Sequence, residues 1–327
     1  MAAAEQILEV EQLKKYYPVK KGLILQKEIG QVRAVDEVSF TLYRGETLGV
    51  IGESGCGKST LIRMLIGLEK PTGGEIRFLG ELIEKGMPAS LRREMQMVFQ
   101  DPYSSLDPRM SVRRILEEPL RIHGGMSTEQ KKQVILPLLE QVGLPREALK
   151  KYPHEFSGGQ RQRIGIARAL ALKPTLLLCD EPVSALDVSI QAQILNLFRD
   201  LQRQYHLTLL FVSHDMSVIR YISDRVMVMY LGQVVEIATK KELFEHPAHP
   251  YTQALMRAVP VPDPERQDQC AVLEGEIPSP IHAPTGCPFS TRCPYASELC
   301  RRQRPQMRPV GEGHLTACHR YSEEVAR

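Results

Sequence analysis

The stretch Gly52-Glu53-Ser54-Gly55-Cys56-Gly57-Lys58-Ser59 decides the fold of this 327-residue chain. It fits the pattern G-x-x-x-x-G-K-[ST], in which glycines let backbone N–H groups converge on phosphate oxygens and the next helix adds the positive end of its dipole. An apolar run at 46–51 precedes it, and a helical pattern at 61–68 follows. This context indicates a phosphate-binding loop rather than a glycine-rich turn that caps an ordinary helix.

Each residue type in the loop suits a nucleoside triphosphate. Lys58 is expected to reach the β- and γ-phosphates as a point charge, and the Ser59 hydroxyl is expected to bind Mg²⁺. Thr60, one residue further into the helix, is placed to donate to the α-phosphate. The residues expected to bind the nucleotide are therefore Gly52, Glu53, Ser54, Gly55, Cys56, Gly57, Lys58, Ser59 and Thr60.

Apolar patterns on both sides of the loop alternate between strands and helices. Strands are predicted at 7–13, 32–42, 46–51, 75–79, 95–99, 175–179, 207–213, 226–229 and 233–237, and helices at 61–68, 159–172 and 188–204. The alternation favours an α/β protein with a largely parallel sheet covered on both faces. A helical block at about 111–151 reads as an insertion, and Pro119 and Pro137 are predicted to kink or interrupt its helices.

Composition excludes several classes of protein. With 43% hydrophobic and 25% charged residues, the bulk of the chain is globular rather than disordered. Lys and Arg number 42 against 39 acidic residues, so the net charge of +3 gives no reason to propose a nucleic-acid partner. Neither a bilayer-spanning apolar run nor a signal peptide is recognisable, so a reducing cytoplasm is expected.

Polar residues at the ends of other predicted strands extend the candidate site. The apolar residues 176–179 lead into two carboxylates: Asp180 is expected to hold magnesium through water, and Glu181 next to it is the candidate base for the attacking water. The remaining motifs are Gln100 after the strand 97–99, Ser157-Gly158-Gly159-Gln160 at a helix start, Ser184-Ala185-Leu186-Asp187, and His214 after the strand 207–213.

These motifs, in this order, resemble the nucleotide-binding domain of ABC transporters from about residue 7 onward. The resemblance implies a P-loop NTPase (RecA-like) core with an antiparallel β subdomain and a helical insertion. It implies that Ser157, Gly158, Gly159 and Gln160 form the signature that acts on a partner's ATP, that Ser184 and Asp187 belong to the D-loop, and that magnesium is held by Ser59, Gln100 and Asp180. His214 is then the switch residue, which contacts the γ-phosphate and holds the geometry of Glu181.

Three further segments, at 13–22, 98–103 and 249–255, look like the dipeptide and oligopeptide importer branch, and the first looks like its F-type ATPase subunit. The branch implies ATP hydrolysis that powers peptide import, with a D-type ATPase, two membrane permeases and a peptide-binding protein as partners, at the cytoplasmic face of the cell membrane. Tyr17 aligns with the aromatic residue that stacks on adenine, with Tyr16 as its rival. A nickel or other small-solute importer and a soluble ABC ATPase are the alternative functions.

Composition changes again after about residue 258, which suggests a nucleotide-binding domain at 1–258, with a helical subdomain at about 101–172, and a Pro- and Cys-rich extension at 259–327. The extension holds Cys287, Cys293, Cys300 and Cys318, with gaps of five, six and seventeen residues. This spacing leaves zinc and an iron–sulfur cluster open.

The resemblance implies a [4Fe–4S] cluster on these four cysteines, with a structural role. Cys56, Cys179 and Cys270 are left out of the set, and His282, His314 and His319 are interpreted as surface or packing residues.

Overall fold

The computed structural model describes residues 5–21, 27–84, 86–257, 276, 278–279, 281 and 284–322. The chain divides into two compact units. The first unit comprises Met1–Glu5, Tyr43–Thr47 and Lys85–Val212, and the second comprises Gln6–Leu42, Leu48–Glu84 and Ser213–Arg327. Cys270, His282 and the predicted boundary at 258/259 lie outside the described residues, so that boundary stays a prediction.

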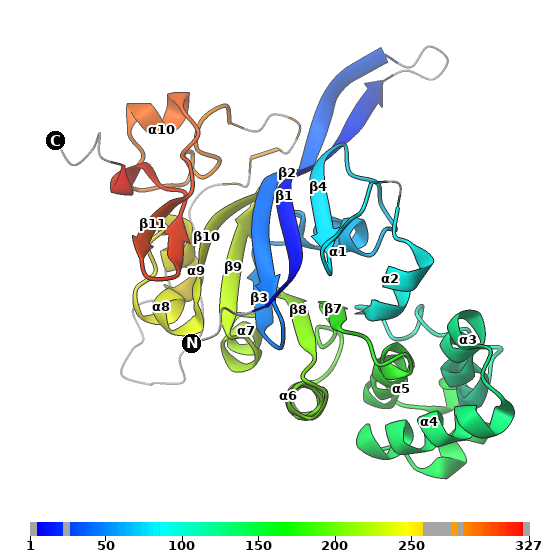
Figure 1. Cartoon of the computed structure of the whole chain (residues 1–327). Helices are drawn as coiled ribbons and strands as arrows, with labels where there is room; N and C mark the ends of the chain where they lie inside the picture. The colour runs from blue at the N-terminus through cyan, green and yellow to red at the C-terminus, as the bar shows by residue number, and fades with distance from the viewer. Residues whose placement is uncertain are drawn as a thin grey trace. The chain divides into compact units, whose positions relative to one another are not determined.

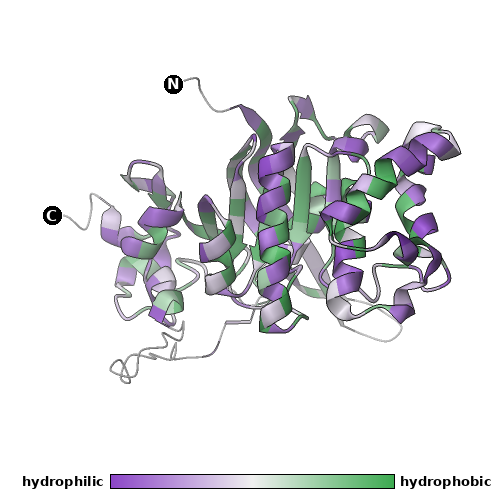
Figure 2. Ribbon diagram, turned by 90° about the horizontal axis from the view of Figure 1, so that it is seen from below, coloured by the Kyte–Doolittle hydropathy of each residue, from purple (hydrophilic) through white to green (hydrophobic). Residues whose placement is uncertain are grey.

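A parallel sheet forms the centre of the first unit. Strands β6 (Met95–Val98), β7 (Leu176–Asp180) and β8 (Thr208–Ser213) lie side by side in that order, and every residue of β7 and β8 is buried. Helices α2 (Ala89–Glu94) and α6 (Val188–Tyr205) belong to the same unit. Strands are mostly hydrophobic in Figure 2 while helices mix both kinds of residue, as expected of a sheet covered on both faces.

The predicted helical insertion is confirmed, but its prolines do not interrupt it. Helices α3 (Val112–Gly124), α4 (Thr128–Gln141) and α5 (Gly158–Leu170) contact one another and are drawn together in green in Figure 1. Short 3₁₀ turns at Arg146–Lys150 and Pro153–Glu155 connect α4 to α5. Pro119 lies inside α3 and Pro137 inside α4. Each proline costs a backbone hydrogen bond, and burial of apolar residues on both helices offsets that loss.

An antiparallel sheet in the second unit confirms the expected β subdomain. Its order is β2 (Lys27–Tyr43), β1 (Gln6–Lys21), β4 (Gly73–Phe78) and β5 (Glu81–Leu82). β1 and β2 are longer than predicted, because the alternation of apolar residues that marks a half-buried strand covers only part of each.

The phosphate-loop motif follows β3 (Thr47–Ile51) and leads into α1 (Lys58–Leu65). β3 pairs in parallel with β9 (Arg225–Tyr230). Three antiparallel pairs follow: β9 with β10 (Gln233–Thr239), β10 with β12 (His314–Thr316), and β12 with β11 (Arg308–Gly311). The helices α7 (Met216–Ile222), α8 (Lys240–Glu245), α9 (Pro250–Arg257) and α10 (Glu298–Arg302), with a 3₁₀ turn at His319–Tyr321, complete the unit. None of the helices in the described ranges is long and apolar enough to cross a lipid bilayer.

The sequence did not predict β11 and β12, which attach the extension to β10. They are short, and Pro309 lies within β11, where proline argues against a strand unless the strand is at an edge. A buried carboxylate strengthens the attachment. Glu236 of β10 accepts the backbone N–H groups of Ala248 (2.7 Å) and His249 (2.9 Å) and lies 2.7 Å from Nε2 of His314 on β12.

His249 beside this carboxylate is built into the core in its neutral form. It is 1% exposed, and its Nδ1 accepts the Tyr251 N–H at 3.1 Å, so that nitrogen carries no proton. Burial lowers the pKa of His249 from 6.5 to about 4, although the Glu236 charge acts in the opposite direction. The histidine therefore fills a packing role. His314 and His319, interpreted above as surface or packing residues, are also buried.

We expect the free energy of unfolding to fall as pH drops from 6.5 towards 4. In that window the unfolded chain binds a proton at His249 that the folded chain does not, and the full shift corresponds to about 3 kcal/mol. His249→Asn offers an acceptor in place of Nδ1 without a titrating group and should flatten this part of the profile. Denaturant midpoints between pH 4.5 and 7.5 measure it; parallel profiles for parent and variant would contradict the assignment.

Candidate functional site

Backbone crowding shapes the phosphate loop, residues 52–59. A Cβ on Gly52 would lie 2.2 Å from the Met229 carbonyl oxygen of β9, and one on Gly57 would lie 2.1 Å from the Ala34 carbonyl oxygen of β2. Gly57 also has a φ of +104°, and Gly55 has +78°. Positions 52 and 57 require glycine because any Cβ there would clash with a backbone carbonyl. Positions 55 and 57 favour glycine because their φ angles are positive.

The Lys58 side chain folds back and hydrogen-bonds to the backbone of its own loop. Its side chain is 4% exposed, and its ammonium donates to the carbonyl oxygens of Gly52 (2.7 Å) and Glu53 (3.1 Å). Burial raises the pKa of Cys56, so this loop cysteine is a packing thiol. The arrangement places one cation and the start of α1 at the centre of a glycine-lined loop, which is a site for an anion.

Two predicted catalytic residues meet in the first unit. β6 and β7 are neighbouring parallel strands, so Gln100 and Glu181, which follow them, lie at the same edge. The Gln100 amide nitrogen donates to Glu181 Oε2 at 3.1 Å. Glu181 has a φ of +44°, a conformation that costs energy in a residue with a side chain and that is concentrated at functional sites. Asp180, directly before it, is 5% exposed.

The Ser-Gly-Gly-Gln motif forms the first turn of α5. Ser157 is an exposed N-cap, its hydroxyl accepts the Gln160 N–H at 3.4 Å, and the Gln160 side chain accepts the Ser157 N–H at 3.1 Å. A Cβ on Gly159 would lie 2.4 Å from Cγ2 of Ile190 on α6. The sequence showed the motif but not this close contact, which fixes the start of α5 against α6.

Ser184 and Asp187 hold the segment between β7 and α6. The Ser184 hydroxyl donates to the Glu181 carbonyl at 3.0 Å. Asp187 caps α6 by accepting the Ile190 N–H at 2.9 Å, and hydrogen bonds from Ile190 and Ser189 lower the pKa of its carboxyl. The segment predicted as a D-loop is thus a turn that ends in a helix cap and is hydrogen-bonded to the backbone of Glu181, the candidate base.

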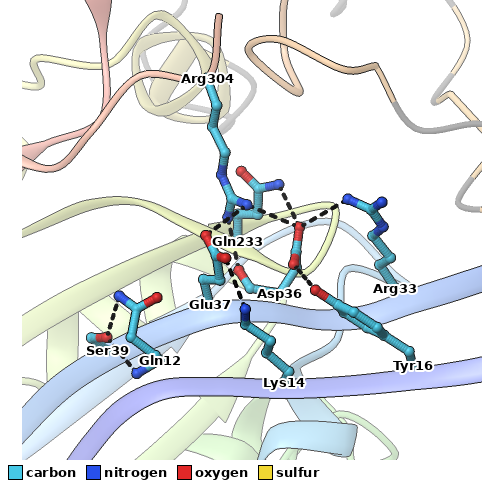
Figure 3. A network of polar contacts seen from close by, with 9 residues as sticks. All are labelled: Gln12, Lys14, Tyr16, Arg33, Asp36, Glu37, Ser39, Gln233 and Arg304. Carbon is cyan, nitrogen blue, oxygen red and sulfur yellow. Dashed lines mark hydrogen bonds and ion pairs between the residues drawn. The ribbon is translucent and has the colours of Figure 1, made fainter. Parts of the chain in front are cut away.

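The two tyrosines that compete for one role on β1 differ in environment. The Tyr16 hydroxyl donates to Asp36, and burial together with this bond raises the pKa of Tyr16 to about 12 (Figure 3). Tyr17 is 36% exposed, and the Lys15 ammonium lies 4.9 Å from its ring centroid. Tyr16 is committed to an internal contact, whereas the ring of Tyr17 is accessible.

The predicted site residues are distributed over both units. The phosphate loop and Thr60, Tyr17 and the exposed His214 belong to the second, while Gln100, Asp180, Glu181 and the Ser-Gly-Gly-Gln motif belong to the first. Gln100 and Glu181 are brought together; the pairings that the resemblance implies across the units stay predictions.

The four cysteines of the extension influence one another electrostatically. Cys287 is 7% exposed, its N–H donates to the Cys300 carbonyl at 2.7 Å, and burial raises its pKa to about 12, with smaller upward contributions from Cys300, Cys318 and Cys293. Burial also raises the pKa values of Cys293 and Cys318. Within the described part of the chain, no three His, Cys, Asp or Glu side chains form a group that could hold a metal ion, so the metal site is not shown.

The chain is similar in sequence to known proteins over nearly its whole length. Residues 35–184 match the ABC transporter family, and residues 235–300 match the oligopeptide/dipeptide transporter C-terminal region. The chain is 52% identical to the oligopeptide transport ATP-binding protein AppF of Bacillus subtilis over 98% of this chain and 100% of that protein. It is 51% identical to the dipeptide transport ATP-binding protein DppF of Escherichia coli over 95% and 93%.

A solved structure shares the fold. It is a dimeric ATP-binding cassette in a post-hydrolysis state with ADP and phosphate, 28% identical, with a TM-score of 0.63 over 72% of this chain and 99% of that chain.

The close contact between α5 and α6 can be tested by measuring the stability of variants at Gly159 and Ile190. Gly159→Ala should lower the free energy of unfolding by about 1–3 kcal/mol, because its methyl group overlaps Ile190. Ile190→Ala removes the overlapping atom, so the double variant should lose less than the sum of the single variants. Gly165→Ala is the matched control on the same helix, because a Cβ there meets no atom within 4 Å. Additive losses in denaturant titrations would show that the contact is not tight.

Proposed function

Because this chain belongs to the ABC transporter ATP-binding proteins of the oligopeptide and dipeptide transport family, we propose that it powers peptide import by hydrolysing ATP. The near full-length similarity to AppF, named as an oligopeptide transport ATP-binding protein, carries the proposal. Two membrane permeases and a peptide-binding protein are its partners, and its place is on the cytoplasmic face of the membrane that holds the permeases.

Each loop and motif has a role in this reaction. The loop N–H groups and Lys58 bind the phosphates, and Glu181 accepts the proton of the attacking water. His214 contacts the γ-phosphate and keeps Glu181 in position. Tyr17 stacks on adenine, which its accessible ring supports over Tyr16.

The residues assigned to magnesium fit that ion by their chemistry. Ser59, Gln100 and Asp180 offer a hydroxyl, an amide and a carboxylate oxygen, the hard donors that Mg²⁺ prefers. Because the carboxylate of Glu181 accepts from the amide nitrogen of Gln100, the amide oxygen is left for a cation. When bound, magnesium neutralises charge that develops on the phosphates.

The exposed helix start at Ser157 acts on ATP held by a second ATPase. Ser157 and Gln160 are exposed at the start of α5, and the positive end of the helix dipole, with the N–H groups of Gly158 and Gly159 in its first turn, would suit the γ-phosphate of ATP bound to another chain. We assign the chain as the F-type subunit and a D-type ATPase as its partner in a head-to-tail pair. The similarity to a cassette described as dimeric supports pairing of two ATPase chains.

Glu181→Gln tests the hydrolytic role. It keeps shape and hydrogen bonding but removes the base, so the assembled transporter should bind ATP and lose turnover by about 10²-fold or more. Phosphate release and nucleotide retention measure the two effects. Glu129→Gln removes another exposed carboxylate of the same unit and should leave both unchanged. Turnover within a few-fold of the parent in the Glu181 variant would remove Glu181 from the mechanism.

We assign a [4Fe–4S] cluster to Cys287, Cys293, Cys300 and Cys318, with a structural role. The donor type suits the group, since all-cysteine ligation is typical of such clusters, and the Cys287 N–H bond to the Cys300 carbonyl brings two of the four residues together. Clusters bind the deprotonated thiolate, so assembly of the cluster would release the protons of these thiols. The cluster would then join the turns that carry these four cysteines.

Anaerobically purified protein should be brown and contain about four irons per chain. Cys293→Ser should lose the iron and increase protease cleavage within residues 284–322, while the parallel strands β6, β7 and β8 and the antiparallel sheet of β2, β1, β4 and β5 stay folded. Cys270→Ser, outside the set, should keep its iron. One zinc and no iron would replace the cluster by a zinc site, and four freely alkylated thiols in metal-free native protein would remove the site.

A further inference from the structure

An arginine of the cysteine-rich extension binds the phosphate loop. Arg292 lies between Cys287 and Cys293 and is 4% exposed. Its guanidinium donates to both carboxylate oxygens of Glu53, at 2.8 and 3.1 Å, and Glu53 is the second residue of the loop. Two parallel bonds between planar groups fix orientation as well as distance, so this pair restrains the loop.

Aromatic residues pack beside the buried guanidinium. The Arg292 guanidinium lies 5.9 Å from the ring centroid of Tyr230 and 6.0 Å from that of Phe289. The hydroxyl of Tyr251 accepts the Glu53 N–H at 2.9 Å, so both the side chain and the backbone of Glu53 are held. Burial lowers the pKa of Arg292, but the bonds to Glu53 outweigh it and raise the pKa above its ordinary value.

Consecutive turns that begin at Cys287 hold Arg292 in place. The Ser290 N–H donates to the Cys287 carbonyl at 3.0 Å, and the Arg292 N–H donates to the Phe289 carbonyl at 3.0 Å. The position of the guanidinium is therefore linked to the cysteine set through five residues of backbone.

The extension makes a second contact of the same kind with β2. Arg304 donates to Asp36 Oδ2 at 3.1 Å and to the Asp36 carbonyl at 2.9 Å, and lies 3.1 Å from Glu37 (Figure 3). Asp36, 2% exposed, also accepts from Tyr16, the neighbour of Tyr17. Arg292 thus contacts the phosphate loop directly, whereas Arg304 contacts Asp36, the partner of the residue that precedes Tyr17.

We propose that the cysteine-rich extension sets the affinity of the phosphate loop for ATP, with Arg292 as a positioning residue that acts through Glu53. The proposal rests on the proposed function, because it assumes that the loop binds ATP. Loss of the cysteine site releases the turns that hold Arg292, and the loop then leaves the conformation in which its N–H groups converge.

Glu53→Gln distinguishes positioning from direct electrostatics by the sign of its effect. If the carboxylate acted on ATP only through its charge, its removal would relieve repulsion and tighten ATP binding. If Glu53 serves as the anchor for Arg292, the same change weakens the bidentate pair, and the Kd for ATP should rise about tenfold. The substitution is isosteric and lies in a partly exposed loop, so it does not depend on repacking of the core.

Arg292→Gln should raise the Kd for ATP of the full chain by a similar factor. The double variant with Glu53→Gln should bind no more weakly than Arg292→Gln alone, because each change removes the same interaction. Arg302→Gln is the matched control: it removes an exposed arginine paired with Glu298 in the same extension, and the Kd should stay within about twofold. In the assembled transporter, KM for ATP should rise while kcat at saturating ATP is retained.

Cys287→Ser tests whether the cysteine set affects the phosphate loop. It should raise the Kd for ATP in the parent but add nothing in the Arg292→Gln background. Tighter or unchanged ATP binding by Glu53→Gln, or additive losses in the double variant, would overturn the proposal while leaving the proposed function intact. Absence of ATP binding by the parent chain would instead overturn the proposed function.

Discussion

The phosphate loop is confined by backbone on two sides, and the second unit is organised around that confinement. Carbonyl oxygens of Ala34 and Met229 lie where any Cβ on Gly57 or Gly52 would be. Strands β2 and β9 can therefore approach the loop only because hydrogen is the side chain there. The extension adds Arg292 to the same loop, so strands and turns far apart in the sequence all contact about eight residues.

The sequence predicted local structure well where the backbone at a position admits few residue types. The glycines of the phosphate loop lie where close backbone contact or a positive φ requires them, and the Ser-Gly-Gly-Gln motif begins a helix as predicted. Prediction was weaker where a feature depends on residues distant in the chain. The contact of Gly159 with Ile190 and the pairing of Arg292 with Glu53 have no local signature, because either partner alone is unremarkable.

The prolines and the late strands show why local rules failed in particular places. Pro119 has the same effect on backbone hydrogen bonding in any helix, but the sequence does not show how much apolar surface α3 buries in compensation. β11 and β12 carry too few residues for a periodic pattern, and their strand conformation is imposed by the existing edge of β10. The adjacency of Gln100 and Glu181 followed only once β6 and β7 were known to be neighbours.

The pairing of β10 with β12 also bears on how the chain is synthesised. Glu236 and His314 are 78 residues apart, so β10 leaves the ribosome well before the strand that covers its edge. Until then, β10 presents unpaired N–H and C=O groups beside an acidic side chain that has yet to meet its histidine. Premature termination before His314 would leave that edge permanently open, a form suited to self-association.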